Sequence, residues 1–126
     1  MIVSIGIDIA EVYRIKETIA RTPRFVERVF TTAEKTYCES KVAAAPQSYA
    51  GRFAAKEAFL KALGTGWRGK VAWRDIEVVL NEQGAPSLAV TGVAKELLDA
   101  TGATRVHVSI SHTTDHAVAQ VILEKT

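Results

Sequence analysis

Two charged side chains on one predicted helix could take part in chemistry. Glu57 and Lys61 are four residues apart in the segment 51–66, so both project from the same face of a helix. Charges of both signs beside a glycine-rich turn suit a site that holds a metal ion together with an anionic ligand. A glutamate followed by a lysine at this spacing is also an ordinary stabilising pair, worth about 0.2–0.5 kcal/mol. The pair alone therefore leaves both interpretations open.

Asp8 supplies a second carboxylate. Apolar residues at positions 3, 5, 7 and 9 alternate with small or polar ones, which predicts a strand with one apolar face and one small or polar face. Asp8 lies on the small face, near the end of that strand. Mg²⁺ prefers few protein ligands, and two carboxylates completed by substrate phosphates are the usual arrangement. Asp8 and Glu57 are therefore the candidate metal ligands, provided that the strand end and the helix face meet.

A glycine pattern at residues 64–70 fits the dinucleotide fingerprint G-x-G-x-x-G literally and nearly fits the P-loop. Both motifs require a preceding strand and a following helix, because the helix N-terminus supplies the amides that bind phosphate. Here a helix precedes the glycines, a strand is expected to follow them, and Val71 replaces the P-loop Ser or Thr. We reject both motifs. The glycines are expected to end the helix and to let the backbone pass close to a ligand.

A histidine and two serines mark the other end of the chain. His112 follows an alternating strand at 106–111, and with His116 it forms H-x-x-x-H, which in a turn is no zinc signature. Ser109 and Ser111 share one face of that strand, where they would either donate hydrogen bonds to phosphate or line a solvent-facing edge. A Ser-His-acid hydrolase remains only a formal possibility because G-x-S-x-G is absent.

Composition limits the classes of protein to consider. The 126 residues, 48% hydrophobic and 24% charged, predict one globular domain over 1–126. A net charge of +2 is too small to indicate nucleic acid, and no apolar run approaches the roughly 20 residues of a membrane span. The single cysteine, Cys38, fits a reducing cytoplasm and is expected to be a buried small residue. Basic residues slightly outnumber acidic ones in the first 28 positions, which indicates a solvated face or a surface for an acidic protein partner.

The predicted elements alternate between helix and antiparallel hairpin. A helix after the first strand should end before Pro23, and the capping box Thr31–Glu34 should open another through about Lys41. A break is expected at 43–46, then a helix from about 48 to 63. Hairpins at 76–80 with 87–90, and at 106–111 with 117–123, flank a helix at 91–101. This order predicts an α+β fold, with a mainly antiparallel sheet and packed helices.

Three segments together resemble one family, the holo-acyl-carrier-protein synthases within the 4′-phosphopantetheinyl transferases. They are Gly6-Ile-Asp-Ile9, the long block at 51–66, and Ser109-Ile-Ser-His112 with Ala117-Val-Ala119. They occur in the family's order and span nearly the whole chain. The resemblance implies the phosphopantetheinyl transferase-like fold of the short branch, which assembles as homotrimers with active sites between subunits.

The resemblance also implies roles for individual residues. Asp8 and Glu57 match the Mg²⁺-binding carboxylates, and Lys61 matches a lysine beside the reacting phosphate, so these three are the predicted catalytic residues. Predicted contacts with coenzyme A are Arg52, Lys61, Ser109, Ser111 and His112. Predicted contacts with an acidic carrier protein are Arg14, Arg21 and Arg24.

The implied reaction is Mg²⁺-dependent transfer of 4′-phosphopantetheine from coenzyme A to a serine of apo acyl carrier protein. The second product would be adenosine 3′,5′-bisphosphate. The alternatives are a non-catalytic module that binds coenzyme A or a nucleotide, and a carrier-binding scaffold with a decayed site. Two positions depart from the family pattern: Ala85 stands where Lys or Arg is usual, and Thr113 where an acidic residue is common.

Overall fold

The computed structural model describes residues 1–64 and 71–126, and it confirms the α+β class. The strands are β1 (Ile2–Glu11), β2 (Ile76–Leu80), β3 (Pro86–Val90), β4 (Arg105–His112) and β5 (His116–Glu124). The helices are α1 (Val12–Arg21), α2 (Phe25–Val29), α3 (Thr32–Ser40), α4 (Ala45–Leu63) and α5 (Gly92–Ala100), with 3₁₀ turns η1 (Val42–Ala44) and η2 (Trp73–Asp75). The described strands form an antiparallel sheet in the order β1-β5-β4 and an antiparallel hairpin of β2 with β3.

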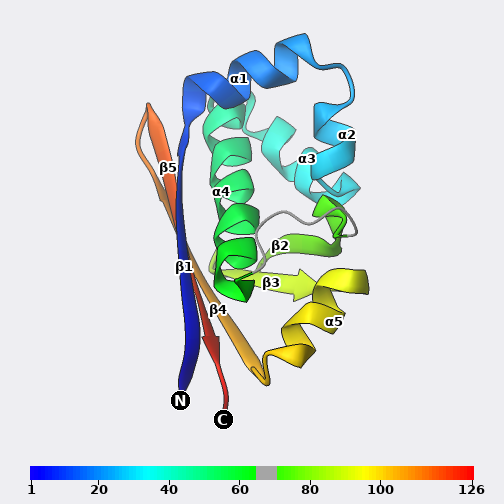
Figure 1. Cartoon of the computed structure of the whole chain (residues 1–126). Helices are drawn as coiled ribbons and strands as arrows, with labels where there is room; N and C mark the ends of the chain where they lie inside the picture. The colour runs from blue at the N-terminus through cyan, green and yellow to red at the C-terminus, as the bar shows by residue number, and fades with distance from the viewer. Residues whose placement is uncertain (65–70) are drawn as a thin grey trace.

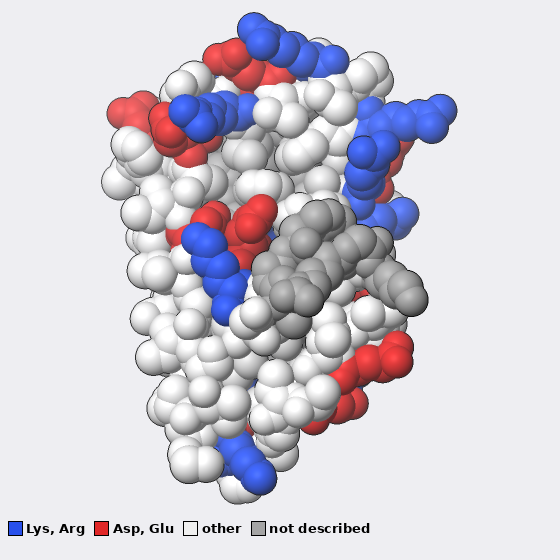
Figure 2. All heavy atoms as spheres, in the orientation of Figure 1, with Lys and Arg blue, Asp and Glu red and all other residues white. Residues whose placement is uncertain are grey.

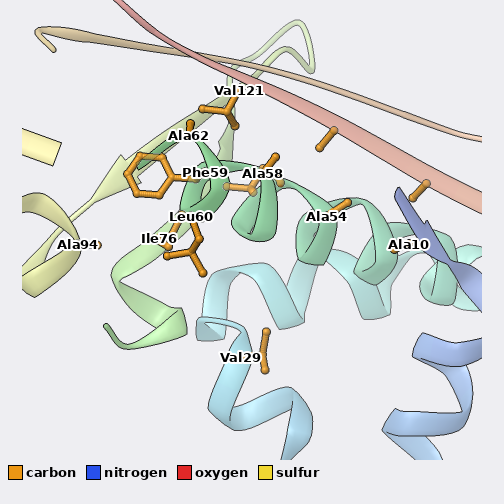
Figure 3. Packing of buried hydrophobic residues seen from close by; sticks show 14 of the residues in the cluster. Ala10, Val29, Ala54, Ala58, Phe59, Leu60, Ala62, Ile76, Ala94 and Val121 are labelled. Carbon is orange, nitrogen blue, oxygen red and sulfur yellow. The ribbon is translucent and has the colours of Figure 1, made fainter. Parts of the chain in front are cut away.

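Helix α4 is the centre of the molecule. It lies against one face of the three-stranded sheet, while the helices α1 to α3 and the β2–β3 hairpin cover its other sides (Figure 1). Small residues let the helix backbone approach the sheet closely: Ala54, Ala58 and Ala62 are buried on α4, and Ala58 and Ala62 lie near Val121 of β5 (Figure 3). Because α4 is surrounded, its buried residues are not confined to one stripe.

The first strand has the predicted alternation, and its small face is the one that packs inward. A Cβ added at Gly6 would lie 2.0 Å from the carbonyl oxygen of Ala58, so β1 crosses directly over the α4 backbone. The opposite face carries Ile5, Ile7 and Ile9, which are 55%, 54% and 65% exposed. The outer face of the sheet is therefore apolar and open in the single chain.

The ends of α4 show one correct prediction and one error. Gly64 ends the helix in the left-handed conformation with φ of 78°, as predicted. A break does separate α3 from α4, at the 3₁₀ turn Val42–Ala44, but the predicted helix start at about 48 is too late, because α4 begins at Ala45 and Pro46 occupies its first turn. Proline is tolerated there since those amides have no partner within the helix. The rest of the glycine pattern, residues 65–70, lies outside the described residues, although the helix before it and the strand β2 after it agree with rejecting the nucleotide motifs.

A fully buried ion pair ties α4 to the covering layer. Lys56 Nζ lies 2.8 Å from Glu34 Oε1 and also donates to the carbonyl oxygens of Trp73, at 3.2 Å, and Ile76. Glu34 closes the predicted capping box with Thr31 and accepts a 2.9 Å hydrogen bond from the amide of Val78. One carboxylate and one ammonium thus join α3, α4 and the start of β2.

None of the helices within 1–64 and 71–126 combines the length and apolar character needed to cross a membrane.

Candidate active site

The structure brings together Asp8 and Lys61, which are far apart in the sequence. Lys61 Nζ donates to Asp8 Oδ1 at 2.9 Å and to the carbonyl oxygen of Ile7 at 3.1 Å. The close packing of Gly6 on α4 makes this contact possible, because it sets β1 beside the face of α4 that carries Lys61. The Lys61 side chain is half exposed, so it is free to change partner when an anion arrives.

Glu57 lies on the same side of α4, and its electrostatics mark it as part of this cluster. Burial raises the pKa of Glu57, the negative charge of Asp8 raises it further, and Lys61 lowers it in part. Two carboxylates are therefore held near each other at some cost, with one lysine to offset them. Such a pair is stabilised by a divalent cation. We call Asp8, Glu57 and Lys61 the carboxylate cluster.

A second cluster lies on the other side of α4. Arg52 and His112, two of the residues predicted to contact coenzyme A, line one pocket of about 350 Å³. Arg52 is 7% exposed and binds Ser48 through Nη1 at 3.0 Å, while its Nε finds no hydrogen-bond partner among the described residues. A buried guanidinium without a carboxylate partner in the described part of the chain favours an anionic ligand. We call this the phosphate pocket.

The phosphate pocket contains residues that the sequence did not single out. The ring of Tyr37 is covered by Lys41, with Nζ 4.7 Å from the ring centroid, and by Arg52 at 4.3 Å. Gln47 donates to the carbonyl oxygen of Thr114 at 3.2 Å. The only signal in the sequence was the four-residue spacing of Tyr37 and Lys41 on a predicted helix, and nothing indicated which element that face would meet.

The two predicted serines lie elsewhere. In the register of β4 with β5, Ser109 faces Gln120 and Ser111 faces Val118, on the outer side of the sheet together with the exposed isoleucines. Ser111 and His112 both line a smaller hollow of about 210 Å³ at that edge. In one chain these serines do not enter the phosphate pocket, so their contact with coenzyme A stays a prediction.

The predicted basic surface is present at the far end of the molecule. Arg14 and Arg21 lie on α1, and Arg24 follows it. A surface hollow of about 400 Å³ is lined by Tyr13, Arg14, Glu17, Thr18, Arg21 and Thr22. These side chains lie outside both clusters.

Helix geometry separates the carboxylate cluster from the phosphate pocket. Arg52 and Lys61 are nine residues apart on α4, which at 3.6 residues per turn puts them about 180° apart around the axis. The strands repeat this separation, because Asp8 is on β1 and His112 on β4, the two edges of the sheet. One chain thus presents two half-sites on opposite flanks of one helix.

Comparison with known proteins agrees with this architecture. The profile of the 4′-phosphopantetheinyl transferase superfamily matches residues 4–121. A holo-[acyl-carrier-protein] synthase of Koribacter versatilis is 50% identical over 98% of this chain and 99% of its own. Two crystal structures of such synthases have TM-scores of 0.82. The Bacillus anthracis protein in complex with CoA (3′,5′-ADP) is 41% identical, and the match covers 100% of this chain and 99% of that protein. The Helicobacter pylori protein in complex with coenzyme A is 33% identical, and the match covers 95% of this chain and 99% of that protein. The chain described here belongs to the 4′-phosphopantetheinyl transferase superfamily.

Proposed function

We propose that this protein transfers 4′-phosphopantetheine from coenzyme A to a serine hydroxyl of apo acyl carrier protein. The family match confirms the expectation of a phosphopantetheinyl transferase. Within this chain, the observation that carries the proposal is the carboxylate cluster: Asp8 and Glu57 are held near each other with Lys61 as their cation. This set of side chains suits a metal-bound pyrophosphate and a departing phosphate.

The residues of the carboxylate cluster fit Mg²⁺ by their chemistry. Among the described residues no three His, Cys, Asp or Glu side chains gather into a metal centre, so two carboxylates would share the ion with phosphate oxygens and water. When bound, Mg²⁺ would stabilise negative charge on the pyrophosphate of coenzyme A. Lys61 forms an ion pair with Asp8 in this structure, and its side chain is exposed enough to turn toward the leaving phosphate and neutralise its charge. Glu57, or a water molecule at the carboxylate cluster, is the candidate base for the incoming serine.

We propose that the phosphate pocket binds the phosphates of coenzyme A. Arg52, Lys41 and His112 converge on a space of about 350 Å³, and Arg52 is fixed by Ser48 and stacked on Tyr37. A fixed, buried guanidinium binds phosphate with little loss of side-chain entropy. Ala85, between the pocket residues Gly84 and Pro86, carries no positive charge, whereas Lys41 is an exposed cation that lines the same pocket.

The separation of the half-sites supports assembly, and we propose a homotrimer with active sites between subunits. A pocket on one copy and a carboxylate cluster on another would complete one site. The open apolar face of β1, with Ile5, Ile7 and Ile9, offers the surface for a second copy. We also propose a cytoplasmic location, since the one cysteine, Cys38, is a buried free thiol.

Intact-mass measurement of apo acyl carrier protein tests the reaction. Incubation with this protein, coenzyme A and Mg²⁺ is expected to add one phosphopantetheine, and EDTA is expected to abolish the gain. Asp8→Asn and Glu57→Gln should each remove turnover, whereas Glu96→Gln on α5 makes the same change as Glu57→Gln far from both half-sites and should retain it. Coenzyme A binding without any mass gain, tried on several carriers, would favour a non-catalytic binding module instead.

Mixing two inactive variants tests the shared site. Arg52→Met removes the guanidinium group of the phosphate pocket, and Glu57→Gln removes one carboxylate of the carboxylate cluster. In randomly co-assembled equal mixtures, about a quarter of the sites would join an intact pocket to an intact cluster, so activity should recover to about that fraction. If each site lay within one chain, the mixture would stay inactive.

A further inference from the structure

The basic surface at α1 has its own acidic partners. Arg14 Nε lies 3.3 Å from Glu11 Oε1, and Arg21 Nη2 lies 3.4 Å from Glu17 Oε2. Within the described part of the chain, Arg24 forms no ion pair. Blue and red side chains are accordingly mixed at the end of the molecule where α1 lies (Figure 2). An acidic partner would therefore meet two arginines, Arg14 and Arg21, that are already engaged.

Glu17 occupies the centre of this surface. It is three residues after Arg14 and four before Arg21, so all three lie on one face of α1, and all three line the 400 Å³ hollow. Glu11 is different, because it ends β1 and lies at the N-cap of α1. A negative charge between two arginines lowers the positive potential that an approaching protein meets, and it competes directly for Arg21.

The ion pair is weak enough to be exchanged. Arg21 and Glu17 are 80% and 51% exposed at their side chains, and ion pairs in water are marginal contacts that salt screens. A carboxylate of the partner can therefore displace Glu17 from its ion pair with Arg21. Glu17 still lies nearby, and its negative charge repels the partner's carboxylate. Its effect should grow with the negative charge of the partner.

We propose that Glu17 is a specificity-determining residue for the carrier protein: it weakens attraction at α1 and so sets how acidic a carrier must be to be modified efficiently. This inference rests on the function proposed above and on the predicted contact of Arg14, Arg21 and Arg24 with an acidic carrier protein. It concerns encounter with the carrier and leaves the chemical step to the two half-sites.

Glu17→Gln tests the proposal, because it removes the charge and keeps the size of the side chain. At low ionic strength kcat/KM for an acidic carrier should rise about two- to fivefold, with kcat unchanged and with a steeper dependence on salt. The gain should vanish at roughly 0.5 M salt, where charges are screened within a few ångströms. A carrier whose surface acids are replaced by amides should gain less, so discrimination between the two carriers should increase.

Glu96→Gln is the matched control. It makes the same change in net charge at an exposed position on α5, at the other end of the molecule, and it should leave kcat/KM unchanged (Figure 1). Equal rates for Glu17→Gln and wild type, or an equal rise in Glu96→Gln, would overturn the inference. Wild-type protein that modifies no carrier would instead refute the proposed function, so the two failures are distinguishable.

Discussion

The buried pair of Lys56 and Glu34 allows a sharp prediction about stability. Both side chains are completely buried, so neither charge is solvated by water. Burial lowers the pKa of Lys56, and the carboxylate of Glu34 counteracts this in part. Removal of one partner from such a pair costs about 3–5 kcal/mol, because the other charge is left buried without compensation.

The contacts of Lys56 lead to a similar loss of unfolding free energy for Lys56→Met. The substitution keeps the volume of the side chain but removes the ion pair and the hydrogen bonds to the carbonyl oxygens of Trp73 and Ile76. Lost hydrogen bonds in a buried site cost about 1–3 kcal/mol each, and the carboxylate of Glu34 is left without its counter-charge. We expect a loss of about 3–5 kcal/mol, a large share of the 5–15 kcal/mol that stabilises a typical domain.

Urea unfolding at fixed protein concentration measures this loss, and a double-mutant cycle with Glu34→Gln isolates the pair. The double variant carries no buried charge, so it should be more stable than the sum of the two single losses predicts, by at least about 1 kcal/mol. Fixed concentration matters because assembly adds to apparent stability. A loss below about 1 kcal/mol for Lys56→Met, or strict additivity in the cycle, would refute the assignment of the pair as a structural anchor.

Three further changes test other parts of the structure. Gly6→Ala would place a methyl group against the α4 backbone and should cost more than about 2 kcal/mol in urea unfolding. Gly51→Ala meets only one side-chain methyl group, Cγ2 of Ile110 at 3.0 Å, and should cost less. Glu57→Gln should raise the melting temperature of the metal-free protein at neutral pH, and it should abolish turnover. Because the pKa of Glu57 is raised in the folded state, the wild-type protein loses stability as the pH rises above 4.5. The higher melting temperature of the variant should therefore disappear below that pH. Ile7→Arg on the exposed face should yield folded monomers in sedimentation velocity with little carrier modification, and an active assembly of unchanged size would contradict the proposed interface.

The order of elements followed from local patterns in the sequence. Capping chemistry fixed the start of α3 at Thr31 and Glu34, and glycine chemistry fixed the end of α4 at Gly64. Alternation identified the strands, because one face of each differs from the other. The short helix α2 was missed, since five residues are too few to show helical periodicity.

The burial of particular faces could not be predicted in this way. Alternation in β1 gave two faces, yet the close approach of α4 to Gly6 decided that the small face is covered. Glu34 was interpreted as a cap alone, because its bond to Lys56 spans 22 residues and depends on packing between elements. The phosphate pocket has the same origin. Tyr37 lies on α3, Lys41 caps its end and Arg52 lies on α4, and no local pattern records the relative position of these two helices.

The course of α4 explains why this chain would need a second copy for its chemistry. A helix between a sheet and a covering layer exposes only its two flanks, and α4 carries a cation-lined pocket on one flank and carboxylates on the other. Residues on opposite sides of a packed helix cannot meet unless the helix unfolds. In an assembly, the phosphate pocket of one copy can face the carboxylate cluster of another. The surface that would permit this contact is the apolar face of β1, which no element within residues 1–64 and 71–126 covers (Figure 1). The same small residues that let β1 approach α4 therefore position Asp8 and turn the isoleucines outward, so the close packing at Gly6 links the proposed metal site to the proposed assembly.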